Sequence, residues 1–166
     1  MKRPPQLFFA FALTLVAGPA AAQTDLCTAL SGTYLTTKID TSGVDTGAKG
    51  RTILTLAPGG VAMMNDSAQY GIEGYQAFGD MQGAWRCEGA DGFHATLLDF
   101  TYPDAANPDA QVARVEVSGT LDDSSKLKGQ TEVHLYPLFD DPLSDATPEL
   151  TVGYAFEGQK LILPPS

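Results

Sequence analysis

The sequence predicts an all-β protein, a single antiparallel up-and-down β-barrel of eight or nine strands over residues 24–166. Short segments with alternating apolar residues recur along the chain, and residues typical of tight turns separate most of them. No segment keeps a helical period over three turns. This number of strands, joined mainly by tight turns, is typical of a barrel that closes around a small cavity.

Residues 1–22 have the features of an export signal that is cleaved. Met1-Lys2-Arg3 is basic, an apolar run extends from Leu7 to Ala17, and Ala20-Ala21-Ala22 supplies the small residues of a cleavage site. The apolar run is far shorter than the roughly 20 residues that a membrane-spanning helix needs. We therefore expect a soluble protein, periplasmic or secreted and not inserted in a membrane, that begins near Gln23.

Charge and cysteine content support this assignment. Twenty acidic and ten basic residues give a net charge of -10, which disfavours nucleic acid as a partner. Two cysteines in an exported chain predict one disulfide, Cys27–Cys87. Closing so long a loop would stabilise the fold by roughly 4 kcal/mol. No C-x-x-C pair is present, so the bridge is expected to be structural rather than redox-active.

The first strands follow directly from the pattern. Leu30–Ile39 alternates, Arg51–Leu56 is the second strand, and Val61–Met64 is its hairpin partner. The intervening Ala57-Pro58-Gly59-Gly60 places proline and glycine where a tight turn needs their backbone conformations.

The fourth strand contains the only tryptophan. Trp85 and Cys87 are two residues apart, so on a strand they share one face of the sheet. The preceding stretch, 65–82, lacks a strand pattern and carries Tyr70, Tyr75 and Phe78 among glycines. Such a loop is either a lid over the barrel mouth or a surface loop whose rings pack back on the core.

The remaining strands are expected at 93–102, 113–121, 129–138, 150–156 and, after a turn at Glu157-Gly158, 160–163. In the hairpin around residues 122–125, pairing Val115 with Leu135 keeps the apolar residues on one face. This register would place Glu116 opposite His134 on the outer face.

Four short motifs carry a resemblance to a known group of proteins. They are Gly32-Thr33-Tyr34, Pro58-Gly59-Gly60, Gly83-Ala84-Trp85 after the tyrosine-containing loop, and Phe93-x-Ala95-Thr96 with Phe100. Together they resemble small exported bacterial proteins of lipocalin-like (calycin-like) type. The resemblance implies a lipocalin-like β-barrel that binds small apolar ligands, and it carries over no catalytic residues.

Asp99 is the one candidate for catalysis. If Trp85 faces inward, strand parity turns Asp99 inward too, where burial would raise its pKa and suit it to general acid–base chemistry. The alternative is a β-bulge between Leu97 and Asp99 that turns Asp99 out and brings Phe100 and Tyr102 in. We favour the bulge, because an unpaired buried carboxylate is costly.

No metal or cofactor is expected. His94 and His134 lack the spacing of a zinc site and are expected to face outward. The acids Asp140, Asp141, Asp145 and Glu149 lack the EF-hand spacing, which favours a solvated acidic loop.

The sequence therefore predicts a binding protein for a small apolar or aromatic molecule. Trp85 and Leu97 would line its barrel, and the rings of Tyr70, Tyr75 and Phe78 would gate the mouth. Two alternatives remain open: a cyclase or isomerase that uses Asp99, and a protein-interaction or inhibitor module. The oligomeric state is not predicted.

Overall fold

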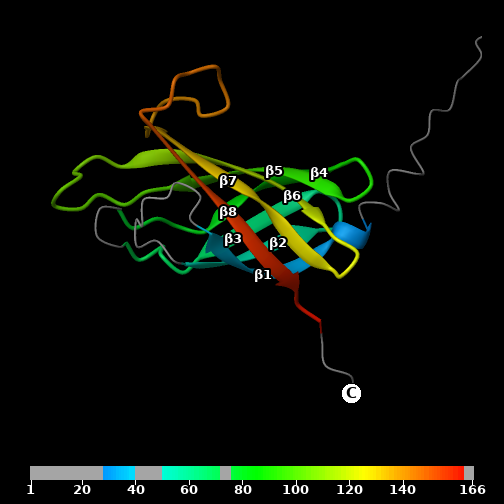
Figure 1. Ribbon diagram of the computed structural model, residues 1–166. Helices are drawn as coiled ribbons and strands as arrows, with labels where there is room; N and C mark the ends of the chain where they lie inside the picture. The colour runs from blue at the N-terminus through cyan, green and yellow to red at the C-terminus, as the bar shows by residue number, and fades with distance from the viewer. Residues whose placement is uncertain (1–27, 40–49, 72–75, 163–166) are drawn as a thin grey trace, which may run out of the picture.

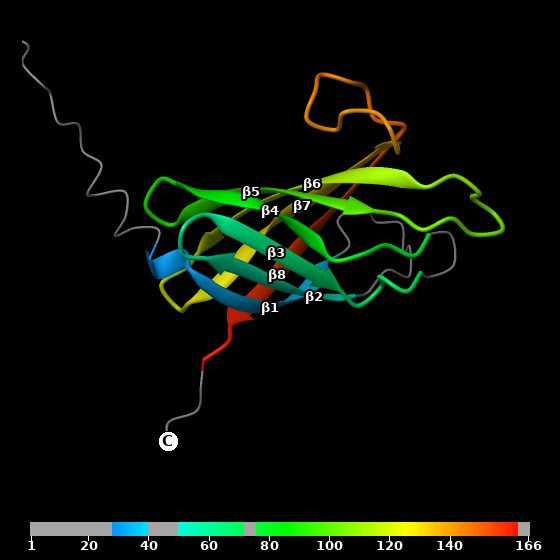
Figure 2. The same cartoon turned by 180° about the vertical axis from the view of Figure 1, so that it is seen from behind.

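The computed structural model describes residues 28–39, 50–71 and 76–162. Within these residues eight strands form a closed antiparallel barrel, in which each strand pairs with the next and β8 pairs with β1 (Figures 1 and 2). This confirms the predicted all-β, up-and-down barrel, an architecture consistent with a lipocalin-like fold. The strands are β1 (Gly32–Ile39), β2 (Arg51–Ala57), β3 (Val61–Asp66), β4 (Met81–Glu88), β5 (Gly92–Phe100), β6 (Gln111–Leu121), β7 (Lys126–Pro137) and β8 (Leu150–Lys160).

The two ends of the barrel are built differently. At one end, which we call the closed end, residues 58–60, 89–91 and 122–125 make the strand-to-strand turns. A helical turn at residues 28–30 lies before β1, and the Tyr34 hydroxyl donates to the Leu30 carbonyl over 2.7 Å. At the other end, which we call the loop end, the longer connections include 101–110 and 138–149.

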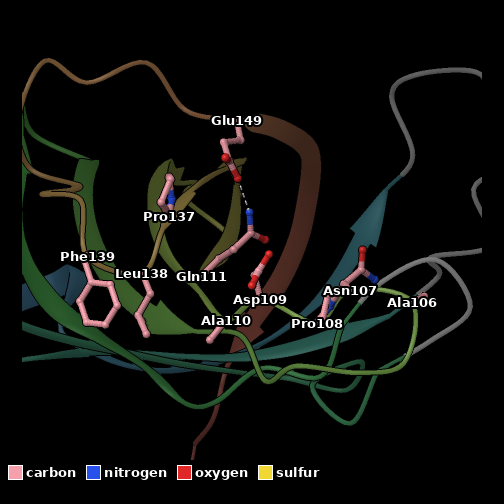
Figure 3. Close-up of a pocket in the computed structure, with 10 residues that line it drawn as sticks. All are labelled: Ala106, Asn107, Pro108, Asp109, Ala110, Gln111, Pro137, Leu138, Phe139 and Glu149. Carbon is pink, nitrogen blue, oxygen red and sulfur yellow. Dashed lines mark hydrogen bonds between the residues drawn. The ribbon is translucent and has the colours of Figure 1, made fainter.

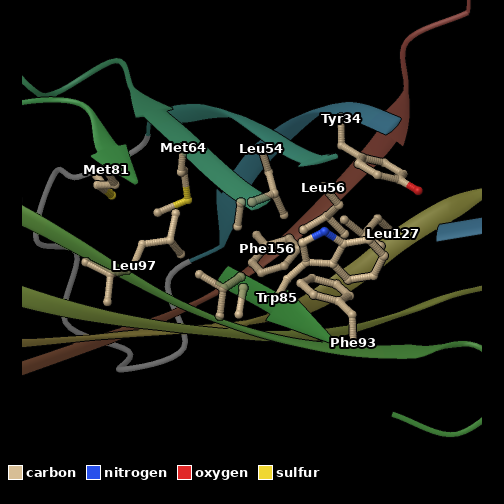
Figure 4. Close-up of a cluster of buried hydrophobic side chains, with 14 of the residues drawn as sticks. Tyr34, Leu54, Leu56, Met64, Met81, Trp85, Phe93, Leu97, Leu127 and Phe156 are labelled. Atoms are coloured by element: carbon tan, nitrogen blue, oxygen red, sulfur yellow. The ribbon is translucent and has the colours of Figure 1, made fainter. Parts of the chain in front are cut away.

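Buried side chains fill the closed end and the middle of the barrel. Trp85 is buried there, and its indole Nε1 donates a hydrogen bond to the Ala57 carbonyl over 2.8 Å, so the polar atom of the ring has a partner. Figure 4 shows the rings and aliphatic side chains of this core, which include Tyr34, Leu56, Trp85, Phe93, Leu127 and Phe156, with Met64, Met81 and Leu97 further along the barrel.

The last strand is longer than expected. We predicted a turn at Glu157-Gly158 and a separate final strand, but β8 continues through both residues to Lys160. Gly158 lies opposite Thr36 on β1 and Leu127 on β7. A Cβ at Gly158 would lie 2.7 Å from the Leu35 carbonyl oxygen, so glycine permits a close approach of strands rather than a turn.

The predicted register of the β6–β7 hairpin is wrong by two residues. Val115 lies opposite Val133, whereas Leu135 lies opposite Ala113. Glu116 consequently faces Glu132 and not His134. A shift of two residues leaves every side chain on its original face, so the apolar pattern cannot distinguish the two registers.

The turn decides this register. Asp122 accepts hydrogen bonds through Oδ1 from the backbone amides of Ser124 and Lys126, both over 2.9 Å. Its own amide donates to the Lys126 carbonyl, and Ser125 adopts a φ of 61°. Asp122 and Lys126 therefore face each other, and a three-residue turn, 123–125, that ends in the left-handed conformation joins the strands.

Cys87 lies near the closed end of β4 and is not a free thiol. Its expected partner, Cys27, lies outside the described residues. The Cys27–Cys87 bridge therefore stays a prediction.

Candidate functional site

The residues predicted to bind ligand lie in different environments in the described structure. Leu97 and Trp85 are packed in the core, and Phe78 packs against it. Tyr70 is almost fully exposed to solvent. Tyr75 lies outside the described residues, so the proposed gating by the three rings stays a prediction.

A group of polar side chains instead faces the interior at the loop end. Lys38 lies opposite the buried Phe156 on an inward-facing position of β1. Its Nζ is 2.5 Å from Oδ2 of Asp66, and the two side chains are 11% and 2% exposed. The same Nζ lies 4.8 Å from the ring centroid of Tyr154, a cation–π distance. We call Lys38, Asp66 and Tyr154, with the hydroxyls of Thr36, Thr52 and Thr131, the inner polar cluster.

The three hydroxyls of this cluster differ in their partners. Thr36 and Thr52 lie opposite each other on β1 and β2, and their Oγ1 atoms share a short hydrogen bond. Thr131 lies opposite Tyr154, is 1% exposed, and its Oγ1 has no hydrogen-bond partner in the described structure. Because buried polar atoms are almost always paired, this hydroxyl is a candidate contact for a bound molecule.

Tyr154 is held in its neutral form. Burial raises the pKa of its phenol, and the nearby negative charge of Asp66 raises it further. The Thr131 hydroxyl lies beside the phenol and lowers its pKa in part, although the two groups do not meet the geometry of a hydrogen bond. The phenol is consequently a hydrogen-bond donor throughout the physiological pH range.

Asp99 faces the interior as well, and the predicted bulge is wrong. β5 pairs with β6 without interruption, Asp99 is 5% exposed, and Phe100 and Tyr102 are the exposed residues. Oδ1 of Asp99 accepts hydrogen bonds from the amides of Gly79, over 3.0 Å, and Phe100, over 2.6 Å. Burial raises the pKa of Asp99, the two amides lower it in part, and the charge of Asp80 adds to the rise.

The wall beside the inner polar cluster is partly open to solvent. Val133, Leu135 and Val152 occupy inward-facing positions of β7 and β8 but are only half-buried. Leu150, opposite Leu135, is 47% exposed. The loop end thus combines an accessible apolar wall with polar groups deeper in the barrel, an arrangement typical of small-molecule sites.

The sequence interpretation missed Lys38, Asp66 and Tyr154. The parity of β1 could have indicated Lys38, because it shares a face with Tyr34 and Thr36. Its pairing with Asp66 had no local signal, since the two residues belong to different hairpins of the chain.

Both histidines face outward, as expected. His94 Nε2 lies 2.9 Å from Oε2 of Glu116, which also accepts a hydrogen bond from Thr96. His134 Nε2 lies 3.6 Å from Glu132. Among the described residues, no group of three or more His, Cys, Asp or Glu side chains is placed to hold a metal ion.

A hollow, which we call the outer groove, lies at the loop end beside the ends of β6 and β7 (Figure 3). It is an open groove of about 500 Å³ between the connection 101–110 and the start of the connection 138–149. Pro108, Leu138 and Phe139 line it, and Phe139 is almost fully exposed. The side-chain amide of Gln111 donates to Glu149 across it over 2.8 Å.

Comparison with known proteins gives no match. No protein-family model matches the chain, and no curated protein or solved structure matches it significantly. In the described ranges, none of the helical structure is long and apolar enough to cross a membrane.

Proposed function

We propose that this chain is an exported binding protein that takes a small apolar or aromatic molecule into the loop end of its barrel. The observation that carries the proposal is the inner polar cluster beside an inward-facing apolar wall that solvent reaches. The resemblance to small exported bacterial lipocalin-like proteins supports the same function. The basic and apolar N-terminus supports a periplasmic or secreted location.

The buried ion pair is the strongest sign of a binding role. Replacing a buried ion pair by apolar residues is often neutral or stabilising, so folding alone does not require a pair such as Lys38–Asp66 inside a barrel. A few polar groups in a largely apolar site are what orient a small ligand. The cluster has this character, because the half-buried Val133, Leu135 and Val152 share its end of the barrel.

The enzyme alternative has weaker support. Asp99 is inward-facing, which a cyclase or isomerase would require of its acid or base. However, its Oδ1 accepts hydrogen bonds from the amides of Gly79 and Phe100, so its visible contacts hold segment 76–80 against β5. A structural role explains these contacts without proton transfer.

The interaction-module alternative has one observation in its favour. The exposed ring of Phe139, with Pro108 and Leu138, lines the outer groove, and an exposed apolar patch can mark a protein-interaction site. We keep it as the second candidate function.

The binding proposal can be tested by filling the interior. Val152→Trp would place an indole into the loop end, whereas Thr151→Trp adds the same group to the neighbouring outward position. With the neutral fluorescent probe N-phenyl-1-naphthylamine, we expect the wild type and Thr151→Trp to bind alike and Val152→Trp to lose affinity at least about tenfold.

Native mass spectrometry of protein from its natural source gives a second readout, a retained small molecule. Circular dichroism confirms that each variant is folded. Equal probe binding by the Val152→Trp and Thr151→Trp variants, or a wild type that neither retains a molecule nor binds the probe, would show the proposal to be wrong.

A further inference from the structure

The inner polar cluster also bears on the charge that the head group of a bound ligand can carry, and this inference rests on the proposed function. Lys38 and Asp66 form an ion pair of zero net charge, with both side chains largely buried. Lys38 is the one basic residue on the inward-facing positions at the loop end of the described strands. At this end, the described strands therefore offer no second inward-facing cation to receive an anionic ligand.

A charged head group would disturb this balance. A carboxylate would have to share Lys38 with Asp66, which places two negative charges around one cation in a poorly solvated interior. Asp99, a third carboxyl group, also faces inward at this end. A cationic head group would compete with Lys38 for Asp66 and leave one cation without a partner.

The cluster does offer hydrogen bonds to an uncharged acceptor. The ammonium of Lys38 has three N–H donors, and among the described residues Asp66 is its ion-pair partner. Tyr154 keeps its phenolic proton, and Thr131 Oγ1 is buried without a hydrogen-bond partner in the part of the chain that is described. These groups lie on β1, β7 and β8, and the ring of Tyr154 lies against the Lys38 ammonium.

We propose that the loop end of the barrel selects an uncharged apolar or aromatic molecule that carries an acceptor oxygen, such as a ketone, ester or alcohol. The oxygen would accept a hydrogen bond from the inner polar cluster, with Thr131 as one donor, while the apolar body lies against Val133, Leu135 and Val152. A single such hydrogen bond contributes about 1 kcal/mol, which corresponds to several-fold in affinity.

Four probes with one ring system and nearly one shape test this selection. They are 2-acetonaphthone, its apolar analogue 2-isopropenylnaphthalene, the anion 2-naphthoate and the cation 2-naphthamidinium. In equilibrium dialysis at neutral pH, we expect the ketone to bind about five- to tenfold more tightly than the apolar analogue. The two ions should bind at least about tenfold more weakly than the ketone.

Variants at two threonines assign the contact. Thr131→Val removes the buried hydroxyl with little change of shape, and it should abolish most of the preference for the ketone without weakening 2-isopropenylnaphthalene. Thr37→Val makes the same change at an exposed outward position of β1 and should leave all four affinities unchanged.

The four probes distinguish a wrong head-group selection from a wrong proposed function. If 2-naphthoate or 2-naphthamidinium binds as tightly as the ketone, the selection for an uncharged head group is wrong although the barrel binds small molecules. An unchanged ketone preference in Thr131→Val excludes the role of that hydroxyl. If none of the four probes binds, the proposed function itself is contradicted.

Discussion

The two inward-facing acids at the loop end have different environments. Asp66 has a cation, Lys38, at 2.5 Å, and its Oδ1 also accepts the amide of Ala68. Within the described residues Asp99 forms no ion pair, and the backbone amides of Gly79 and Phe100 are its hydrogen-bond donors. The first acid has an ion-pair partner, whereas the second has backbone amides as partners within an apolar interior.

This difference predicts a pH dependence for Asp99. Burial raises the pKa of its carboxyl above the unfolded value, so the folded state favours the protonated form. The stabilisation from this proton is fully present below the unfolded pKa of about 3.9 and is lost as pH rises through the folded pKa. Asp99→Asn, which keeps an acceptor oxygen without the charge, should therefore raise the melting temperature more at about pH 7 than at about pH 3.

Thermal unfolding monitored by circular dichroism checks this prediction, and Asp140→Asn in the exposed connection 138–149 is the matched control. The control should shift the melting temperature little at either pH. A melting temperature that falls by the same amount at both pH values for Asp99→Asn would mean that burial of the charge is not what distinguishes Asp99.

At the scale of single elements, two glycines of β8 differ in the space that an added Cβ would have. Gly158 lies where β1, β7 and β8 come together, and an added Cβ would lie 2.7 Å from both the Leu35 carbonyl oxygen and Cγ2 of Thr36. At Gly153, in the same strand, the nearest atom would be 3.6 Å away, an ordinary contact. The two residues look alike in sequence, yet only the first is sterically required.

We expect Gly158→Ala to lower the free energy of unfolding by about 1–3 kcal/mol, because backbone on the neighbouring strand must move. Gly153→Ala should change it by less than about 0.5 kcal/mol or raise it slightly. Urea unfolding of both variants measures the difference. Similar losses in the two variants would contradict the close approach of β8 to β1.

At the scale of the whole molecule, the closed end is where the predicted disulfide belongs. Leu30 is buried in the helical turn that follows Cys27 in the sequence, and Cys87 lies near the closed end of β4. A Cys27–Cys87 bridge would tie the N-terminal segment to this end, opposite the proposed binding site.

If the bridge forms, thiol titration of the denatured, unreduced protein should detect no free cysteine. Reduction should then lower the free energy of unfolding by up to roughly 4 kcal/mol, because it frees a long loop in the unfolded chain. Two reactive thiols per chain would contradict the prediction. The double variant Cys27→Ser/Cys87→Ser controls for effects of the reductant itself, since its stability should not respond to reduction.

Several features of the protein could be determined from the sequence by itself. The alternation of apolar residues predicted the strands and their inward faces, and the turn residues at 58–60 and 122–125 predicted two hairpins. Strand count and short connections predicted the closed barrel. These features depend on residues near one another in the chain, where local periodicity carries the information.

Only the tertiary structure decided the register, the length of β8 and the composition of the site. Alternation repeats every two residues, so it assigns a side chain to a face but leaves the pairing of Val115 with Val133 or Leu135 open. Alternation also predicts an inward-facing Asp99, but the expected cost of a buried carboxylate favoured the outward face. The structure shows that the amide of Gly79, 20 residues away, donates a hydrogen bond to this carboxylate. Lys38 on β1 meets Tyr154 because barrel closure pairs β1 with β8, and it meets Asp66 of β3 across the inner face of β2; no local pattern encodes either contact.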